Sequence, residues 1–392
     1  MAGIARDEYL ARLPKVQEAM QAQELDALIA YSTAKVGANV RYLTSYFVRF
    51  TGMQTRKDSS YYMFGAAAAL IPPQGEPLVR TDQPWDEARC KQMSLYPESG
   101  YTSRFADDFG PIIRQRGYRR VGIDNWYLFP AHEYLALKAA APDTEFVETR
   151  VISEVRRVKS PAEIEIMRRS VQVGIQAVNR ALDAVKVGAT EYDIVLICEQ
   201  VMREHGELEL AGQSIAGCGV NTATGSHIPT SSPQNNEAMK NGEWYMLDVC
   251  PRVDGYAADI ARHRVAGDLE ALDGRLRKLY DATHLMSEEV RKAIKPGVSG
   301  WQLNQLAMDV AVQEGVGKHK IDLLGHGVGL DIHDVPDYYY DDTPWQAGEI
   351  LTIEPCLLMP GVGGTRIEDL ILVTDQGHEV LTETPRQLLG QG

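Results

Sequence analysis

Apolar positions in the first 150 residues alternate between a helical and a strand-like spacing. The segment Tyr9–Gln23 places its apolar residues on one side and predicts an amphipathic helix. The runs Leu25–Tyr31 and Val121–Asp124 are short, apolar and typical of buried strands. Helices that alternate with such strands predict an α/β domain in which some strands are parallel.

A rise in charge over residues 151–159 marks a boundary in the chain. The tetrapeptide Ser160-Pro161-Ala162-Glu163 follows and has the residue types of a helix start, with serine as N-cap, proline first and glutamate third. Apolar residues at helical spacing continue this predicted helix to about Val185. We therefore expect one domain over residues 1–155 and a second over residues 156–392.

The second domain combines a few further helices with many short strands and glycine-rich turns, so its expected class is α+β. The apolar runs Trp244–Val249 and Tyr256–Val265 predict two strands, and the dipeptide Asp254-Gly255 predicts a tight turn between them. The further helices are expected over Glu191–His205, Leu269–Ile294 and, approximately, Gly300–Glu314.

Two pairs of acidic residues lie on either side of two predicted hairpin turns. Asp248 and Asp259 bracket the turn just described, so a tight hairpin would place them opposite each other or close to it. Glu354 and Glu368 bracket Gly361 in the same way. Residues directly opposite in an antiparallel pair have Cβ atoms about 5 Å apart, and like charges there are destabilising. A divalent cation removes this repulsion because it needs clustered oxygen ligands.

A glycine-flanked histidine, His326, lies between the two acid pairs in the sequence and could enter a crowded site. Taken singly, each acid could be a solvated surface residue and the histidine a turn residue. Asp248 and Glu354 are embedded in apolar sequence, however, where a charge needs a partner or a metal. Four carboxylates and one imidazole suit Mn²⁺, Fe²⁺, Co²⁺ or Zn²⁺. Four negative charges predict two cations, which about 3.5 Å apart can share a water and lower its pKa.

Composition and charge narrow the classes of function. The chain has 392 residues, of which 44% are hydrophobic and 24% charged, as in ordinary globular proteins. Its net charge of −14 argues against a nucleic-acid-binding surface, which is normally basic. The N-terminus has charges where a signal peptide needs an apolar stretch, and the run Met63–Pro72 is too short to span a bilayer. Five cysteines without CxxC spacing predict a reducing, cytoplasmic setting without structural disulfides. The shortness of the apolar run predicts no membrane association.

The five candidate ligands stand in the order and local context of a known family. The stretches DGYAADIAR, GHGVGLDIHDVP, TIEP and TRIED resemble those of the pita-bread metallopeptidases, which include methionine aminopeptidase, Xaa-Pro aminopeptidase and Xaa-Pro dipeptidase (prolidase). The stretch RRVKSPAEIEIMRRS resembles the start of the family's catalytic domain, and NVRYLTSY resembles its creatinase-like N-terminal domain. The resemblance implies an N-terminal creatinase-like α/β domain followed by a C-terminal pita-bread catalytic domain.

The resemblance also implies roles for residues around the ligands. His227, in SHIPTSS, and His333, in DIHDVP, match histidines that contact the substrate and its tetrahedral intermediate. Glu354 matches the ligand that also carries the proton of the attacking water, and Arg366 matches an arginine that pairs with carboxylates. Family members with this N-terminal domain are commonly homodimers.

Four positions depart from the family's pattern and change the expected surroundings of the substrate. Cys250 and Cys356 stand where metallopeptidase members usually have glycine, each two residues after a candidate ligand. Residues i and i+2 of a strand face the same way, so both thiols could fill space in the pocket, ligate a softer metal or narrow the substrate site. Asp322, which we expect near the substrate, stands where peptidase members often have histidine, and His263 replaces a small hydroxyl residue.

These features support one leading hypothesis and leave rivals open. The leading hypothesis is a two-metal hydrolase that cleaves an amide C–N bond of a small peptide, most like an Xaa-Pro dipeptidase or aminopeptidase, with Mn²⁺ as the first expected cation. The altered substrate surroundings leave open a creatinase-like or ectoine-hydrolase-like enzyme for a small non-peptide substrate, or a metal-dependent lyase of the dimethylsulfoniopropionate type. A binding scaffold without catalysis is disfavoured, because such scaffolds generally lose metal ligands and this chain has all five.

Overall fold

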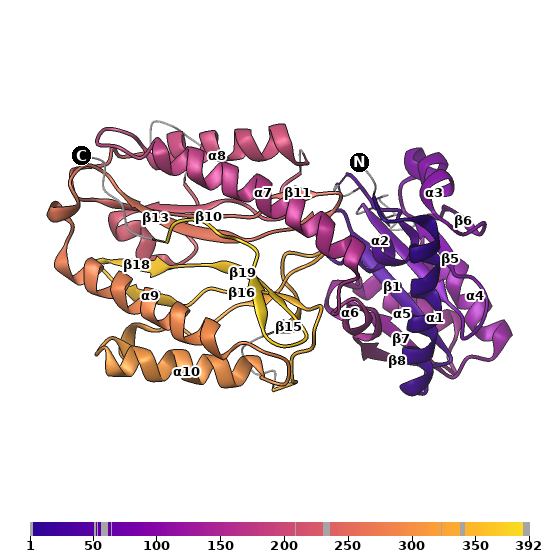
Figure 1. Cartoon of the computed structure of the whole chain (residues 1–392). Helices are drawn as coiled ribbons and strands as arrows, with labels where there is room; N and C mark the ends of the chain where they lie inside the picture. Colours follow the sequence, from indigo (N-terminus) through magenta and orange to yellow (C-terminus); the bar gives the residue numbers. More distant parts are fainter. Residues whose placement is uncertain are drawn as a thin grey trace. The chain divides into compact units, whose positions relative to one another are not determined.

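The computed structural model describes residues 3–386 apart from residues 51, 53, 56–61, 64, 208, 230–235, 323 and 338–341. The chain divides into two compact units, Met1–Arg156 and Arg157–Gly392 (Figure 1). Each unit has its own sheets and its own hydrophobic core. The expected combination of an α/β region with an α+β region is observed. No helix in the described part of the chain is long and apolar enough to cross a membrane.

The first unit is built on a six-stranded mixed sheet of order β6-β5-β4-β1-β7-β8. Strand β1 pairs in parallel with β7 and antiparallel with β4, so the two apolar runs predicted as strands are neighbours in the middle of the sheet. The predicted first helix is α1, and helices then alternate with single strands except between α2 and α3, where strands β2 to β5 follow one another. The bounds are α1 Arg6–Ala22, β1 Ala27–Thr33, α2 Asn39–Thr44, β2 Gln54–Thr55, β3 Tyr62–Met63, β4 Ala66–Ile71, β5 Leu78–Thr81, α3 Glu87–Met93, β6 Ser99–Tyr101, α4 Phe105–Arg116, β7 Arg120–Asp124, α5 Ala131–Ala140, β8 Glu145–Thr149 and α6 Val151–Val155.

The second unit begins with two helices, α7 (Pro161–Asp183) and α8 (Glu191–His205), that start where the sequence predicts. A capping box fixes the start of α7, because the Glu163 N–H donates to Ser160 Oγ at 3.2 Å and the Ser160 N–H donates to Glu163 Oε2 at 2.8 Å. Thr190 caps α8 in the same manner. The apolar sides of both helices pack on strands β10 and β13 and form one hydrophobic core.

The third predicted helix is shorter than expected, since α9 spans Gly274–Ala293 and not the whole of Leu269–Ile294. Asp273 is its N-cap and accepts from the Arg275 N–H at 2.8 Å, so the helix begins there. Residues Leu269–Ala271 form a separate 3-10 turn. The last helix, α10 (Gly300–Gln313), ends within one residue of the expected position.

Strands fill the space between the two helix pairs of the second unit, with α7 and α8 on one side and α9 and α10 on the other (Figure 1). They form a three-stranded sheet of order β13-β10-β9, a five-stranded sheet of order β15-β14-β16-β19-β20, and the small hairpins β11-β12 and β17-β18. The bounds are β9 Ile215–Cys218, β10 Trp244–Val249, β11 Arg252–Val253, β12 Tyr256–Ala257, β13 Ile260–Val265, β14 His326–Gly327, β15 Asp334–Asp337, β16 Ile350–Ile353, β17 Cys356–Met359, β18 Gly363–Arg366, β19 Asp369–Val373 and β20 His378–Val380.

The first hairpin has the predicted turn, but its second strand is interrupted. The segment predicted as one strand over Tyr256–Val265 is divided into β12 and β13, and Asp259 lies in the break. Asp248 pairs with Ala261, and Val249 pairs with Ile260. The same register continues beyond the break, where Arg252 pairs with Ala257, so Asp259 lies across from residue 250 and diagonal to Asp248.

The second hairpin places its two glutamates opposite each other. Ile353 pairs with Asp369 in one ladder, and Cys356 pairs with Arg366 in the next, with no change of register between them. Glu354 and Glu368 therefore face each other in the gap between the two ladders. The Glu368 N–H also donates to the Ala261 carbonyl at 3.2 Å, which joins the second hairpin to the first.

Candidate metal centre

The five predicted ligands come together in the interior of the second unit. They are Asp248, Asp259, His326, Glu354 and Glu368, and none of these residues is more than 8% exposed. Ligand atoms of Asp259, His326 and Glu368 all lie within 4.8 Å of one another, and those of Asp248, Cys250 and Asp259 form a second such group. Asp259 belongs to both groups, so the two share one carboxylate.

His326 is held with one ring nitrogen toward the carboxylates. Its Nδ1 lies 3.0 Å from the Gly327 carbonyl oxygen, which can only accept, so Nδ1 carries the proton. Its Nε2 lies 3.4 Å from Glu354 Oε1 and 3.8 Å from Asp259 Oδ2. An imidazole whose outer N–H donates to a carbonyl, while its other nitrogen faces carboxylates, has the arrangement of a metal ligand.

The pKa values of Asp259, Glu354 and Glu368 are shifted toward the protonated forms. Burial, and then the carboxylate of Asp248, raises the pKa of Asp259 well above the ordinary range. Burial, and then the carboxylate of Asp259, does the same to the pKa of Glu368. Burial also raises the pKa of Glu354, although the nearby Arg366 opposes the shift. A pKa raised in this way means that the ionised form lacks sufficient positive charge around it.

The guanidinium of Arg366 contacts two of the four carboxylates. Arg366 Nη1 donates to Asp248 Oδ2, and its Nε lies 3.2 Å from Glu354 Oε2. Burial acts to lower the pKa of Arg366, but Glu354 and Asp248 outweigh it and raise this pKa further. Both oxygens of Glu368 remain without a hydrogen-bond partner among the described residues, and Glu368 is 1% exposed. A buried carboxylate left without a donor suits a cation, so these residues fit the divalent ions that the sequence predicts.

His263, one of the departures from the family pattern, contacts the backbone of Arg366. Its Nε2 accepts a hydrogen bond from the backbone N–H of Arg366 at 3.1 Å, and its ring packs on Trp244 with ring centroids 4.6 Å apart. Burial lowers the pKa of His263 to about 3, so the ring is neutral and free to accept. We infer that His263 is a structural residue in the wall of the site.

The two histidines expected on the substrate side occupy different surroundings. His333 is exposed, and its ring centroid lies 4.2 Å from that of His326, so it stands at the edge of the ligand group. His227 is half-buried, and its Nε2 lies 2.9 Å from Oε2 of Glu191, the first residue of α8. Glu191 had no signal in the sequence beyond its place at a helix start. The substrate roles of both histidines stay predictions.

Asp322 is exposed and belongs to a short polar chain that sequence reasoning missed. Its Oδ1 accepts from Asn304 Nδ2 at 2.6 Å, and Asn304 Oδ1 accepts from the buried Lys320 Nζ at 2.7 Å. Because an ammonium can only donate, the lysine fixes which end of the Asn304 amide faces Asp322. No local pattern could have indicated this chain, since α10 supplies Asn304 from a distant part of the sequence.

A family model for "Metallopeptidase family M24" matches residues 165–375, and one for "Creatinase/Prolidase N-terminal domain" matches residues 12–158. The first match covers more than half of the chain, so the protein belongs to metallopeptidase family M24. The predicted family, its two-part fold and the class of metal-dependent hydrolase are thereby confirmed, and the creatinase-like and lyase alternatives are not favoured.

The chain is also similar to proteins with individual names. It is 28% identical over 333 residues to an Xaa-Pro dipeptidase from Pyrococcus horikoshii, covering 84% of this chain and 91% of the relative. It is 30% identical over 240 residues to an Xaa-Pro dipeptidase from Pyrococcus furiosus, covering 61% of this chain and 67% of the relative. A prolidase structure from P. horikoshii OT3 superposes with a TM-score of 0.81 at 24% identity, covering 97% of this chain and all of that one. A dipeptidase from Mycobacterium ulcerans superposes at 0.83 with 22% identity and 99% coverage of both chains. The two structural comparisons, at 24% and 22% identity, show the fold of this chain.

Proposed function

We propose that this protein is a metal-dependent Xaa-Pro peptidase, an enzyme that hydrolyses the amide bond preceding proline in a small peptide. The observation that carries the proposal is the buried group of four carboxylates and one imidazole, in which the Glu368 carboxylate has no hydrogen-bond partner among the described residues. The Xaa-Pro dipeptidases among its relatives support proline as the residue after the cleaved bond. Dipeptides and longer peptides are both candidate substrates.

Two divalent cations would be held by Asp248, Asp259, His326, Glu354 and Glu368, with Mn²⁺ as the first expectation and Co²⁺, Zn²⁺ or Fe²⁺ as alternatives. Bound there, such ions polarise a carbonyl and lower the pKa of a water. Four ionised carboxylates and one guanidinium carry a formal charge of −3, so bound cations would favour the ionised forms of Asp259, Glu354 and Glu368.

The chain's own groups would then bind, orient and transfer protons. Glu354 takes the proton of the attacking water and returns it to the leaving amine. His227 contacts the substrate carbonyl and donates to the oxygen on which charge develops, and His333, exposed at the edge of the site, helps it to stabilise the tetrahedral intermediate. Arg366 holds Asp248 and Glu354 in position. Asp322, oriented by Asn304, lies among the substrate-binding residues.

We further propose a cytoplasmic enzyme that works as a homodimer, with no nucleic-acid or membrane partner. All five cysteines are free thiols in the structure, which suits a reducing compartment. The dimer is expected from the resemblance of the N-terminal domain to creatinase-like domains.

A substrate panel tests the proposed function. Purified protein in Mn²⁺ or Co²⁺ buffer is given Gly-Pro, Ala-Pro and longer Xaa-Pro peptides, with creatine and ectoine beside them. We expect cleavage of one class of proline peptide, loss of the activity with a chelator and its return when the metal is added back. Gly-Ala is the matched control, since it has the same bond without the proline ring. Turnover of creatine or ectoine with no proline peptide cleaved would contradict the assignment.

A further inference from the structure

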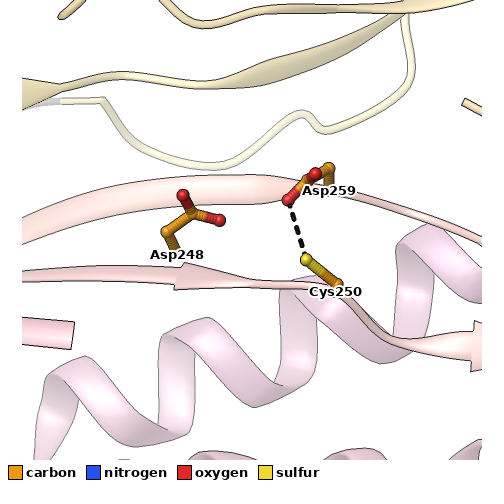
Figure 2. Close-up of side chains that lie close together, drawn as sticks. All are labelled: Asp248, Cys250 and Asp259. Carbon is orange, nitrogen blue, oxygen red and sulfur yellow. Dashed lines mark hydrogen bonds between the residues drawn. The ribbon is translucent and has the colours of Figure 1, made fainter. Parts of the chain in front are cut away.

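A thiol lies among the carboxylates of the metal centre. Cys250 follows strand β10, and its Sγ donates to Asp259 Oδ1 at a distance of 3.4 Å. Figure 2 shows Cys250 and Asp259 facing each other across the hairpin, with the carboxylate of Asp248 beside them. Ligand atoms of the three residues lie within 4.8 Å of one another.

The backbone holds the thiol at this place. Asp248 and Cys250 are two residues apart on one strand, so their side chains leave it on the same face. The register of the hairpin puts Asp259 across from Cys250. The sulfur also lies near Gly212, where an added Cβ would stand 3.1 Å from Sγ. Cys250 is 7% exposed, so the thiol is enclosed between Gly212 and the acids.

The separation of the donors suits one cation bound between them. A tetrahedral ion with bonds of about 2.3 Å to sulfur and about 2.1 Å to oxygen keeps those two atoms roughly 3.5 Å apart. Cys250 Sγ and Asp259 Oδ1 are already at that separation. Asp259 also belongs to the group with His326 and Glu368, whose buried and unpartnered carboxylate independently indicates a ligand at this centre.

We propose that Cys250 is a direct sulfur ligand of the cation held by Asp248 and Asp259, and that it makes this position prefer Zn²⁺ or Co²⁺ to Mn²⁺. Thiolates favour softer cations, whereas carboxylates and water suit Mn²⁺. The thiol would lose its proton to the buffer as the ion binds, so a sulfur–metal bond would replace the hydrogen bond from Cys250 to Asp259. The other position, with Asp259, His326 and Glu368, has only nitrogen and oxygen donors and keeps the preference for Mn²⁺.

The inference deepens the proposed function, because it requires cations at this centre, but it can fail by itself. Metal-free wild-type protein, Cys250→Ser and Cys356→Ser are titrated with Co²⁺ while bound cobalt and the absorption spectrum are measured. Cys356 is the matched control, since it is also buried and also follows a ligand carboxylate by two residues, yet it belongs to neither ligand group. We expect the near-ultraviolet thiolate-to-cobalt band in the wild type and in Cys356→Ser, and its loss in Cys250→Ser with cobalt still bound.

Each other outcome overturns a different statement. Cobalt bound by the wild type without the band, or a band that persists in Cys250→Ser, overturns thiolate ligation and leaves the peptidase proposal in place. A wild type that binds no cobalt, Zn²⁺ or Mn²⁺ overturns both.

The preference between metals gives a second measurement that needs no spectrum and no activity. Wild type and Cys250→Gly, which restores the residue usual in the family, are dialysed against equal concentrations of Zn²⁺ and Mn²⁺, and bound metal is counted. We expect the Zn²⁺-to-Mn²⁺ ratio to fall on the order of 10-fold in the variant, the usual size for one change around a metal site. An unchanged ratio, with melting curves that show both proteins folded, overturns the preference.

Discussion

Glu368 and Asp369 are adjacent carboxylates, each no more than 1% exposed, in opposite electrostatic surroundings. Asp369 accepts from Arg262 Nη2 and from Arg386 Nε, both at 2.7 Å, and Arg291 Nη1 lies 3.7 Å away. Burial acts to raise the pKa of Asp369, but Arg262 and Arg386 outweigh it and lower this pKa. Glu368 has no donor among the described residues, and burial together with Asp259 raises its pKa.

The difference separates two reasons for burying a charge. Neighbouring residues of extended chain point to opposite faces, so one backbone segment serves both. On one face three arginines of the chain surround Asp369, which thereby joins distant segments. On the other face the chain supplies carboxylates in excess, and the unpaired Glu368 leaves room for an ion from solution. A buried acid without a donor is therefore a better sign of a ligand than burial alone.

Neutralising Glu368 tests the functional face and has the largest expected effect. Glu368→Gln keeps the shape but removes the charge, so we expect peptidase kcat/KM to fall by at least about 100-fold, since even residues that only orient metal ligands cost 10–100-fold. Bound metal, measured by elemental analysis, should fall with it. The free energy of unfolding of the metal-free variant should lie within about 1 kcal/mol of that of the metal-free wild type. The reason is that the Glu368 carboxylate has no hydrogen bond to lose among the described residues. Full metal content with full activity would show that Glu368 is not a ligand.

Neutralising Asp369 tests the structural face. Asp369→Asn leaves three buried or partly buried guanidiniums without their carboxylate, so we expect the free energy of unfolding to fall by about 3–5 kcal/mol. Denaturant titration measures the change, and activity per folded molecule should be preserved. Asp375→Asn is the control, because Asp375 is an exposed acid on the turn that follows the same strand. A loss shared equally by both variants would contradict this role for Asp369.

The buried His263 predicts a smaller effect that depends on pH. Its pKa is about 3 in the folded protein and about 6.5 in the unfolded chain, so the unfolded state binds the extra proton between these values. The stability that the neutral ring contributes is complete above about pH 6.5 and is lost as the pH falls toward 3, by about 2 kcal/mol between pH 7 and pH 5.

His263→Gln can still accept the Arg366 N–H but does not titrate. We therefore expect the gap in unfolding free energy between wild type and this variant to narrow by about 2 kcal/mol from pH 7 to pH 5 in metal-free protein. Taking the difference between the two proteins removes the contribution of the acids, which both share. A gap that stays constant over this range would mean that the ring already carries its proton in the native state.

Local signals in the sequence were sufficient for several elements. Helix α8 has its predicted bounds, and α7 starts at its predicted capping box, because caps and periodic apolar residues act within one segment. The predicted start of α9 was wrong, since its apolar pattern extends upstream of the N-cap at Asp273. The strand predicted over Tyr256–Val265 was also wrong as one element, since residues 258 and 259 separate β12 from β13.

The candidate site shows the same division. The spacing of Glu354 and Glu368 around Gly361 already indicated that they face each other, since a hairpin register follows from its turn. The partners of the expected substrate residues, Glu191 for His227 and Asn304 for Asp322, could not be predicted. They come from helices 36 and 18 residues earlier in the chain, and no local pattern records such a pairing.

The sequence by itself determined the order of helices and strands and the two hairpins. It also determined which acidic side chains and which histidine are candidates for one site. Only the tertiary structure decided which buried acid receives an arginine and which is left for an ion. The physical reason is that hydrogen bonding, periodicity and turn geometry act over a few residues, whereas the charge around a carboxylate is summed over every segment packed against it.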